Sequence, residues 1–191
     1  MTVRVGMAEA PGFVRGRLGG FRGTRWVGLD GKGAAGKTTL AAAVAAALDD
    51  AVVVHVDDFA RRSVPTWERD RFVAQVLDPL RAGRPARYER WDWEADTSLG
   101  WAEVPVGVAV VVEGVSSTDV RLGVPWDVTL WVEAAAEVRL ARALARDGEA
   151  MREQWVERWM PAEDAYEAAQ RPQERVDAVV VDDAAPVFLP Q

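Results

Sequence analysis

The residues of this chain best suited to phosphate chemistry lie in one short run of glycine, alanine, lysine and threonine. Residues 31–38 read G-K-G-A-A-G-K-T, which fits the pattern G-x-x-x-x-G-K-[ST] of a phosphate-binding loop, the P-loop or Walker A motif. Gly31 and Gly36 let the backbone turn so that successive N–H groups point at phosphate oxygens. Lys37 can lie along the β- and γ-phosphates of a nucleotide, and the Thr38 hydroxyl can ligate Mg²⁺.

The elements on either side of this loop strengthen that interpretation. An apolar stretch at 25–29 predicts a strand directly before the loop, and an alanine-rich stretch at 39–48 predicts a helix directly after it. The amino end of that helix carries a partial positive charge and would face the same phosphates. The alternative is a glycine-rich turn that fits the pattern by accident. Such a turn would not need a strand before it and a helix after it, so the sequence predicts a nucleoside triphosphate site. The residues predicted to bind the nucleotide are Gly31, Lys32, Gly33, Ala34, Ala35, Gly36, Lys37, Thr38 and Thr39.

Acidic residues follow two other apolar runs that are typical of buried parallel strands. Asp57 and Asp58 come after the run 51–56, and Glu113 comes after the run 106–112. Ligands of open parallel sheets bind at the carboxyl ends of the strands, where these carboxylates would lie. A carboxylate there can hold Mg²⁺ directly or through water, and either aspartate could accept the proton of an attacking hydroxyl. Alternatively, the two aspartates only begin a turn or cap a helix.

Three arginines share one face of a predicted helix. Arg139, Arg142 and Arg146 are spaced three and four residues apart, and a glycine stop follows at 148. They could form a solvated face paired with neighbouring glutamates, or a lid that presents guanidinium groups to phosphates. Arg146 is best placed for the second role, and Arg152 is a weaker candidate.

Tryptophans and the single histidine allow two interpretations. Aromatic side chains can stack on a planar substrate, but they more often pack in a core or a hinge. His55 lies inside an apolar run, which predicts a packed, hydrogen-bonded core residue. The tryptophans concerned are Trp91, Trp93, Trp101, Trp155 and Trp159.

Composition excludes several classes of site. The chain has 191 residues, a net charge of −7 and no cysteine, which argues against disulfides, thiolate–zinc sites and a nucleic-acid or anionic-membrane surface. No apolar run approaches the roughly 20 residues of a membrane helix, and the first residues do not form a signal peptide. We therefore expect a soluble cytoplasmic protein with no nucleic-acid or membrane partner; the sequence does not set its oligomeric state.

The alternation of strands and helices predicts a single α/β domain with parallel strands over 1–191. Residues 1–24 are predicted to form an N-terminal arm that could hold one short helix, and 87–96 a loop or short hairpin. Predicted strands span 25–29, 51–56, 106–112, 126–132 and 178–181. Predicted helices span 39–48, 66–80, 134–146, 149–159 and 161–170, the last opened by Pro161.

Taken together, these motifs resemble the uridine kinase group, which also includes phosphoribulokinase and type I pantothenate kinase relatives. The likeness rests on the P-loop, the D-D-F step at 57–59, the E-G step at 113–114 and the R-L-x-R-x-x-x-R-D helix at 139–147, and it spans about 26–182. It implies a P-loop fold with a five-stranded parallel sheet and a helical lid at about 139–160. It also implies transfer of the ATP γ-phosphate to a substrate hydroxyl. Asp57 would act as base, Thr38 and Glu113 would serve Mg²⁺, and Arg142 and Arg146 would be the lid arginines.

The chain departs from this group where the acceptor would bind. The segment 60–67 is short, and the base-contacting Y-D-F-x-x-H step of uridine kinases appears at 91–96 as W-D-W-E-A-D. ATP chemistry on a small polar metabolite, which could be a nucleoside, is therefore the expected function. The alternative is a nucleotide-binding regulatory or switch protein without metabolite kinase activity, although no guanine-reading N-K-x-D step is present. The residues predicted to contact the acceptor are Asp58, Trp91, Asp92 and Asp96.

Overall fold

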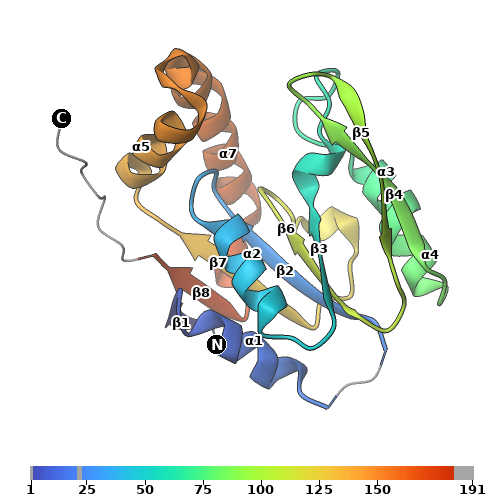
Figure 1. Cartoon of the computed structure of the whole chain (residues 1–191). Helices are drawn as coiled ribbons and strands as arrows, with labels where there is room; N and C mark the ends of the chain where they lie inside the picture. Colours follow the sequence, from blue (N-terminus) through green and yellow to red (C-terminus); the bar gives the residue numbers. More distant parts are fainter. Residues whose placement is uncertain (1, 21–22, 183–191) are drawn as a thin grey trace.

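Six parallel strands form the central sheet of this computed structural model, which describes residues 2–20 and 23–182. Their order across the sheet is β1-β8-β7-β2-β6-β3, and every neighbouring pair is parallel (Figure 1). The strands are β1 (Val3–Gly6), β2 (Arg25–Gly31), β3 (Ala51–His55), β6 (Ala109–Glu113), β7 (Val128–Glu133) and β8 (Ala178–Val181). The predicted α/β class with a parallel sheet is confirmed, with six strands where five were expected.

The additional strand comes from the segment predicted to be an arm. Val3 pairs with Ala178 at the edge of the sheet, and helix α1 (Ala10–Leu18) follows. The predicted short helix is present, but Val14 and Leu18 of α1 are buried in the core. The description of this segment as an arm is therefore wrong, because its apolar side chains complete the sheet and its cover.

Apolar side chains cover both faces of the sheet. In β6, Val111 belongs to a cluster with α1 and α2 (Lys37–Ala46), whereas Val110 and Val112 belong to a second cluster with Phe72 and Trp26. This alternation follows the two-residue period of a strand, and cover on both faces is typical of a parallel sheet. Two buried faces leave the carboxyl edge of the sheet as the place for polar function.

The helix predicted at 66–80 begins and ends slightly later. It comprises α3 (Arg69–Phe72), the π-helical turn Val73–Leu77 and α4 (Asp78–Arg81), without a break. Pro79 lies in the first turn of α4, and the helix ends shortly after it, at Arg81. A proline cannot donate to the preceding turn, and the wider π turn just before α4 accommodates this.

An antiparallel hairpin follows, where a loop or short hairpin was predicted. It pairs β4 (Ala86–Asp92) with β5 (Thr97–Val104) and is separate from the central sheet. In Figure 1 the hairpin rises on the right and the α5–α7 segment on the left of the loop that precedes α2.

The predicted lid is helical, but its divisions differ from those expected. Helix α5 (Ala136–Asp147) is followed by the 3₁₀ turn Glu149–Met151, then by α6 (Arg152–Gln154), the π turn Trp155–Trp159 and α7 (Met160–Gln170). Helix α7 has the predicted bounds, with Pro161 in its first turn, but it follows the π turn without a break, so the last three segments form one continuous helix. As at Pro79, a π turn precedes the proline. No helix among residues 2–20 and 23–182 is long and apolar enough to cross a membrane.

Candidate active site

The P-loop joins β2 to α2 and needs glycine where the chain turns. Gly31 has a φ of 146°, and a Cβ there would lie 2.4 Å from the carbonyl oxygen of Val132. Gly36 has a φ of 99°, and Ala34 also has a positive φ of 59°. These left-handed conformations fold the loop over the amino end of α2, which is the geometry that directs N–H groups at an anion.

Lys37 is the first residue of α2 and is held inside the loop. Its Nζ donates to the carbonyl oxygen of Lys32 at 2.7 Å, and the side chain is buried. Burial lowers the pKa of Lys37, and the negative charges of Glu113, Asp30 and Asp57 oppose that shift. The ammonium group is therefore surrounded by acidic groups at the carboxyl edge of the sheet.

Thr38 and Glu113 provide the oxygen atoms expected of a magnesium site. Thr38 Oγ1 donates to Glu113 Oε1 at 3.2 Å, and Glu113 is buried at the carboxyl end of β6. A hydroxyl and a carboxylate are hard oxygen ligands, which Mg²⁺ prefers, and Mg²⁺ usually takes only one or two protein ligands beside phosphates and water. The residues present therefore fit that ion. No cluster of three or more His, Cys, Asp or Glu side chains that could hold a metal occurs among the described residues.

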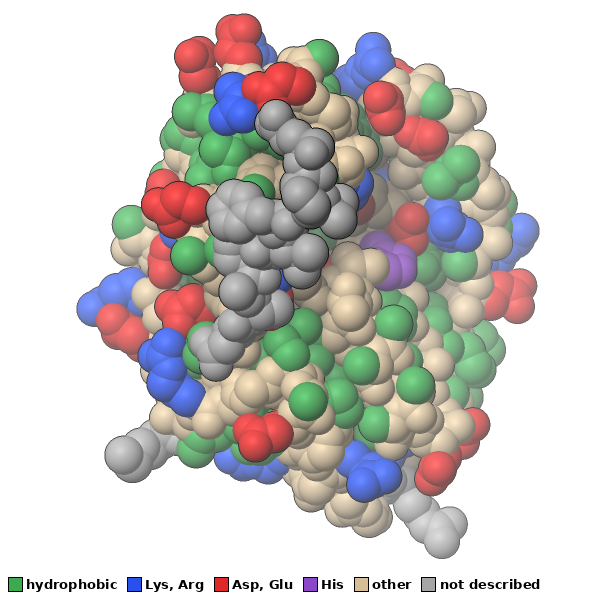
Figure 2. All heavy atoms as spheres, turned by 60° about the vertical axis from the view of Figure 1, so that its left-hand side comes forward, with side chains coloured by type: hydrophobic (Ala, Val, Ile, Leu, Met, Phe, Trp, Pro, Cys, Tyr) green, Lys and Arg blue, Asp and Glu red, His purple; other side chains and the backbone are tan. Residues whose placement is uncertain are grey.

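His55 is hydrogen-bonded, as predicted, but it is not a packed core residue. It ends β3, where it lies in register with Glu113 of β6. Its Nδ1 lies 2.5 Å from Glu113 Oε1, and this hydrogen bond raises the pKa of His55. The His55 side chain is 39% exposed. Figure 2 shows the only histidine of the chain at the surface beside charged side chains. His55 is thus a site residue that sequence reasoning missed, although its place at a strand end was the available signal.

Asp57 lies in the 3₁₀ turn Val56–Phe59 that follows β3. Its side chain remains exposed, yet the surrounding protein and the charge of Glu113 raise the pKa of its carboxyl. The positive charges of Lys37, His55 and Arg146 oppose this shift. Asp57 therefore shares one electrostatic environment with Lys37, Glu113 and Arg146 of α5.

Asp58 points to different partners. It is buried, accepts a hydrogen bond from Tyr88 Oη at 3.3 Å and pairs with Arg90 Nε at 3.4 Å. Burial and the nearby Asp58 raise the pKa of Tyr88. Both partners belong to β4, so Asp58 attaches the hairpin to the end of β3.

The other predicted acceptor contacts lie at the hairpin turn. Asp92 Oδ1 accepts the backbone N–H groups of residues 94 and 95, each at 2.9 Å. Trp91 Nε1 donates to Asp96 Oδ1 at 3.0 Å, and the Arg61 guanidinium carbon lies 3.7 Å from the centre of a Trp91 ring. These contacts give the three residues a structural role in the hairpin turn. That they bind an acceptor stays a prediction.

The three arginines of α5 have three different surroundings. Arg139 is buried against Glu163 at 2.9 Å. Arg142 pairs with Asp182, just after β8, at 2.6 Å. Arg146 is exposed at the end of the helix, where it makes two bonds to Asp147 at 2.6 and 3.0 Å. Of the three, Arg146 is the one whose charge acts on Asp57. Arg152, the weaker candidate, pairs with an exposed glutamate on its own turn.

Three tryptophans connect the P-loop to the hairpin tip. A Cβ added to Gly33 would lie 2.7 Å from the Trp155 ring. The Trp155 and Trp159 rings lie 4.8 Å apart, and the Trp93 and Trp159 rings lie 5.7 Å apart, both edge to face. Trp155 Nε1 also donates to Asp147 at 2.9 Å. The row links the P-loop, the helical turn Trp155–Trp159 and the hairpin.

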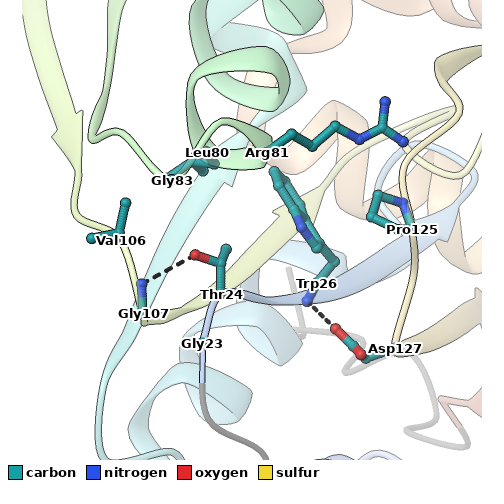
Figure 3. Close-up of a pocket in the computed structure, with 10 residues that line it drawn as sticks. All are labelled: Gly23, Thr24, Trp26, Leu80, Arg81, Gly83, Val106, Gly107, Pro125 and Asp127. Carbon is teal, nitrogen blue, oxygen red and sulfur yellow. Dashed lines mark hydrogen bonds between the residues drawn. The ribbon is translucent and has the colours of Figure 1, made fainter.

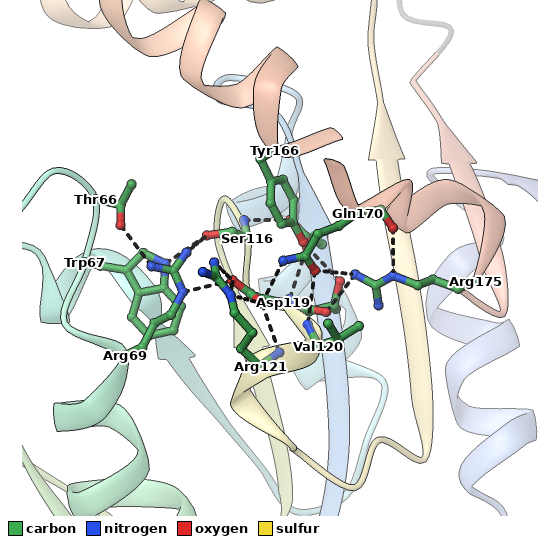
Figure 4. A network of polar contacts seen from close by, with 12 residues as sticks. Thr66, Trp67, Arg69, Ser116, Asp119, Val120, Arg121, Tyr166, Gln170 and Arg175 are labelled. Carbon is green, nitrogen blue, oxygen red and sulfur yellow. Dashed lines mark hydrogen bonds and ion pairs between the residues drawn. The ribbon is translucent and has the colours of Figure 1, made fainter. Parts of the chain in front are cut away.

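A buried polar network lies behind the P-loop, and the sequence did not point to it. Asp30 is fully buried and accepts five hydrogen bonds, among them one from Tyr166 Oη at 2.6 Å and one from the Gly31 N–H at 2.7 Å. Asp119 lies close by (Figure 4); burial would raise its pKa, but hydrogen bonds from Arg121 and Gln170 lower it well below the usual range. The only available signal was Asp30 itself, an acid inside an apolar strand.

A cavity of about 610 Å³ lies at the opposite, amino edge of the sheet. Its lining includes Trp26, Arg81 and Asp127, and the Trp26 N–H donates to Asp127 at 2.7 Å (Figure 3). None of the predicted site residues lines it.

Solved structures with a similar fold include two that are described as possible or candidate kinases. A possible uridine kinase from Bacillus stearothermophilus has a TM-score of 0.65 at 18% identity, over 91% of this chain and 98% of that one. A candidate fructose transport system kinase from Silicibacter sp. TM1040 has a TM-score of 0.61 at 23% identity, over 92% and 98% of the two chains. The YGR205w protein has a TM-score of 0.51 at 11% identity, over 83% and 82%. No protein-family profile and no curated protein sequence matches the chain. At these identities the likeness shows the fold, which is that of a uridine kinase-like P-loop kinase.

Proposed function

We propose that this protein is an ATP- and Mg²⁺-dependent kinase that transfers the γ-phosphate to a hydroxyl of a small polar metabolite. The observation that carries the proposal is the position of Asp57 in the turn after β3, at the carboxyl edge of the sheet, where the charges of Lys37, Glu113 and Arg146 act on its carboxyl. A kinase site needs a base, a phosphate-binding lysine, a metal ligand and a cationic side chain close together.

The chemistry assigns a separate task to each group. Asp57 takes the proton of the acceptor hydroxyl, whose oxygen attacks the γ-phosphorus while the bond to the β–γ bridging oxygen breaks and ADP leaves. A raised pKa makes Asp57 a stronger base than an ordinary aspartate. Lys37 and the loop N–H groups hold the phosphates, and Arg146, together with Arg142, neutralises charge on the moving phosphoryl group.

Magnesium, held with the nucleotide by Thr38 and Glu113, would supply positive charge at the β- and γ-phosphates. His55 Nδ1 contacts the same Glu113 oxygen, Oε1, as the Thr38 hydroxyl does, and so helps to orient the carboxylate. No further acidic ligand is needed for the ion, because Mg²⁺ usually binds one or two protein ligands and completes its coordination with phosphates and water.

The acceptor is proposed only as a hydroxyl-bearing polar metabolite, with a nucleoside as one candidate. One similar structure is described as a possible uridine kinase and another as a candidate fructose transport system kinase, so the two descriptions name different acceptors. These descriptions support kinase chemistry more than any one acceptor. A protein of this kind would act where ATP is supplied, in the cytoplasm.

A screen for acceptor-dependent ADP release tests the proposal. ATP and Mg²⁺ are offered with a panel of nucleosides, sugars and other hydroxyl metabolites, with Asp57→Asn as the control for contaminating activity. At least one acceptor is expected to raise ADP release by wild type and not by the variant. Slow ATP turnover that no acceptor increases would instead favour a nucleotide-binding regulatory or switch protein.

A further inference from the structure

One peptide group of the P-loop is held from both sides. Its carbonyl oxygen, from Lys32, accepts a hydrogen bond from the Lys37 ammonium at 2.7 Å on the inner side of the loop. Its N–H, from Gly33, donates to Glu163 Oε1 of α7 at 2.9 Å. Because the two atoms belong to the same planar peptide group, the orientation that Glu163 imposes is also the one presented to Lys37.

Glu163 is itself fixed by a buried arginine. Arg139 Nη1 lies 2.9 Å from Glu163 Oε2 and 3.4 Å from the carbonyl oxygen of Gly33. The side chains of Arg139 and Glu163 are only 3% and 7% exposed. The pair therefore contacts both polar backbone atoms of Gly33.

This pair is poorly explained by fold stability alone. Removing two charges from water costs several kcal/mol per ion, and apolar side chains of similar volume often serve stability as well. Arg139 Nε is buried and finds no hydrogen-bond acceptor in the part of the chain that the structure describes. Beyond packing, Arg139 and Glu163 supply two hydrogen bonds to the backbone of Gly33.

The contact leaves no space for a different arrangement. A Cβ on Gly33 would lie 2.6 Å from Glu163 Oε1 and 2.7 Å from the Trp155 ring. The preceding side chain, Lys32, also pairs with α7, through Glu167 at 2.5 Å. Two successive P-loop residues are therefore attached to one helix.

We propose that Glu163, held by Arg139, is a positioning residue that sets the P-loop peptide at 32–33 and through it the Lys37 ammonium for nucleotide binding. The inference rests on the proposed function, because it assumes that the loop binds nucleotide phosphates. A loop fixed before the ligand arrives avoids the cost of ordering it on binding. Without the acceptor at position 163, the peptide can rotate, and both Lys37 and the neighbouring N–H groups lose their fixed direction.

The test compares two double variants that differ in a single property. Arg139→Met/Glu163→Gln keeps an oxygen acceptor for the Gly33 N–H, whereas Arg139→Met/Glu163→Met does not, and neither leaves a buried unpaired charge. ADP affinity is measured by titration calorimetry with Mg²⁺. The Gln variant is expected to bind ADP within about 3-fold of wild type, and the Met variant at least about 5-fold more weakly, the size of one hydrogen bond. Equal affinities for the two variants would overturn the proposal.

Charge and folding are controlled separately. Asp164→Asn removes one negative charge from the same helix and leaves Lys32 paired with Glu167, so its ADP affinity is expected to stay at the wild-type value. Should the Met variant fail to fold, amide hydrogen exchange of Gly33 in nucleotide-free wild type decides: protection supports the proposal, and exchange at the rate of a free loop refutes it. Wild type that binds no ADP would refute the proposed function itself, whereas ADP binding with equal double variants would refute only the role of Glu163.

Discussion

Replacing Tyr166 by phenylalanine removes a single hydroxyl from the network behind the P-loop. That hydroxyl donates to Asp30 Oδ2 at 2.6 Å, and Asp30 is fully buried. A hydrogen bond to a charged group contributes about 1.5–3 kcal/mol, and burial prevents water from replacing the lost donor. We therefore expect Tyr166→Phe to lower the free energy of unfolding by about 1.5–3 kcal/mol.

Tyr88→Phe is the matched control, because the chemical change is the same. The Tyr88 hydroxyl lies 3.3 Å from Asp58 Oδ2, and Asp58 also pairs with the exposed Arg90. Its loss should cost about 1 kcal/mol or less. Urea unfolding of wild type and both variants measures the difference, with an unchanged m-value showing that the unfolded states are comparable. A cost for Tyr88→Phe equal to or larger than that for Tyr166→Phe would refute the reasoning.

Three further predictions concern the site itself. Gly31→Ala places a Cβ 2.4 Å from a backbone oxygen of β7, so urea unfolding should show a loss of about 1–3 kcal/mol and calorimetry a loss of ADP binding. Arg146→Met should lower the acceptor-dependent kcat by at least about 10²-fold in steady-state assays, whereas Arg152→Met should leave it unchanged. The bond to Glu113 raises the pKa of His55, so the stability it gives is complete below the ordinary pKa of 6.5 and is lost as pH rises through the higher folded-state value. Urea unfolding should therefore show wild type losing stability relative to His55→Gln as the pH rises above 6.5; a constant difference would contradict this.

Local spacing made the P-loop and the two elements that flank it predictable. The glycines, Lys37 and Thr38 lie in one short segment, and the strand and helix around them have strong local patterns. The same holds for Asp57 and Glu113, because each ends a β-branched run and the carboxyl ends of parallel strands meet at one edge.

Long-range pairing explains what the sequence did not reveal. His55 was assigned to the core because its neighbours are apolar, and its contact with Glu113 depends on the register of β3 with β6. Strand β1 is only four residues long, and its partner β8 lies at the other end of the chain. Neither relation leaves a local periodic pattern.

The helical segment 136–170 shows a different limit. Pro161 lies in the first turn of α7, as predicted, but the π turn at 155–159 joins α7 to the preceding helix without the expected break. Similarly, the three arginines of α5 share a predicted face, yet Arg139 is buried, Arg142 contacts Asp182 and Arg146 is exposed. Helical spacing places them on one side, and only the packing of α5 against α7 and β8 separates their environments.

The most direct test of the central claim, that Asp57 is the base of a metabolite kinase, compares two adjacent aspartates. Product formation from ATP and the best acceptor is measured for wild type, Asp57→Asn and Asp58→Asn, together with ADP affinity. Asp57→Asn is expected to lower acceptor-dependent kcat by at least about 10²-fold with ADP binding largely retained, because a general base contributes about 10²–10⁴-fold. Asp58→Asn, whose carboxylate is engaged by Tyr88 and Arg90, is expected to have a much smaller effect on kcat. Wild-type turnover in Asp57→Asn would contradict the account.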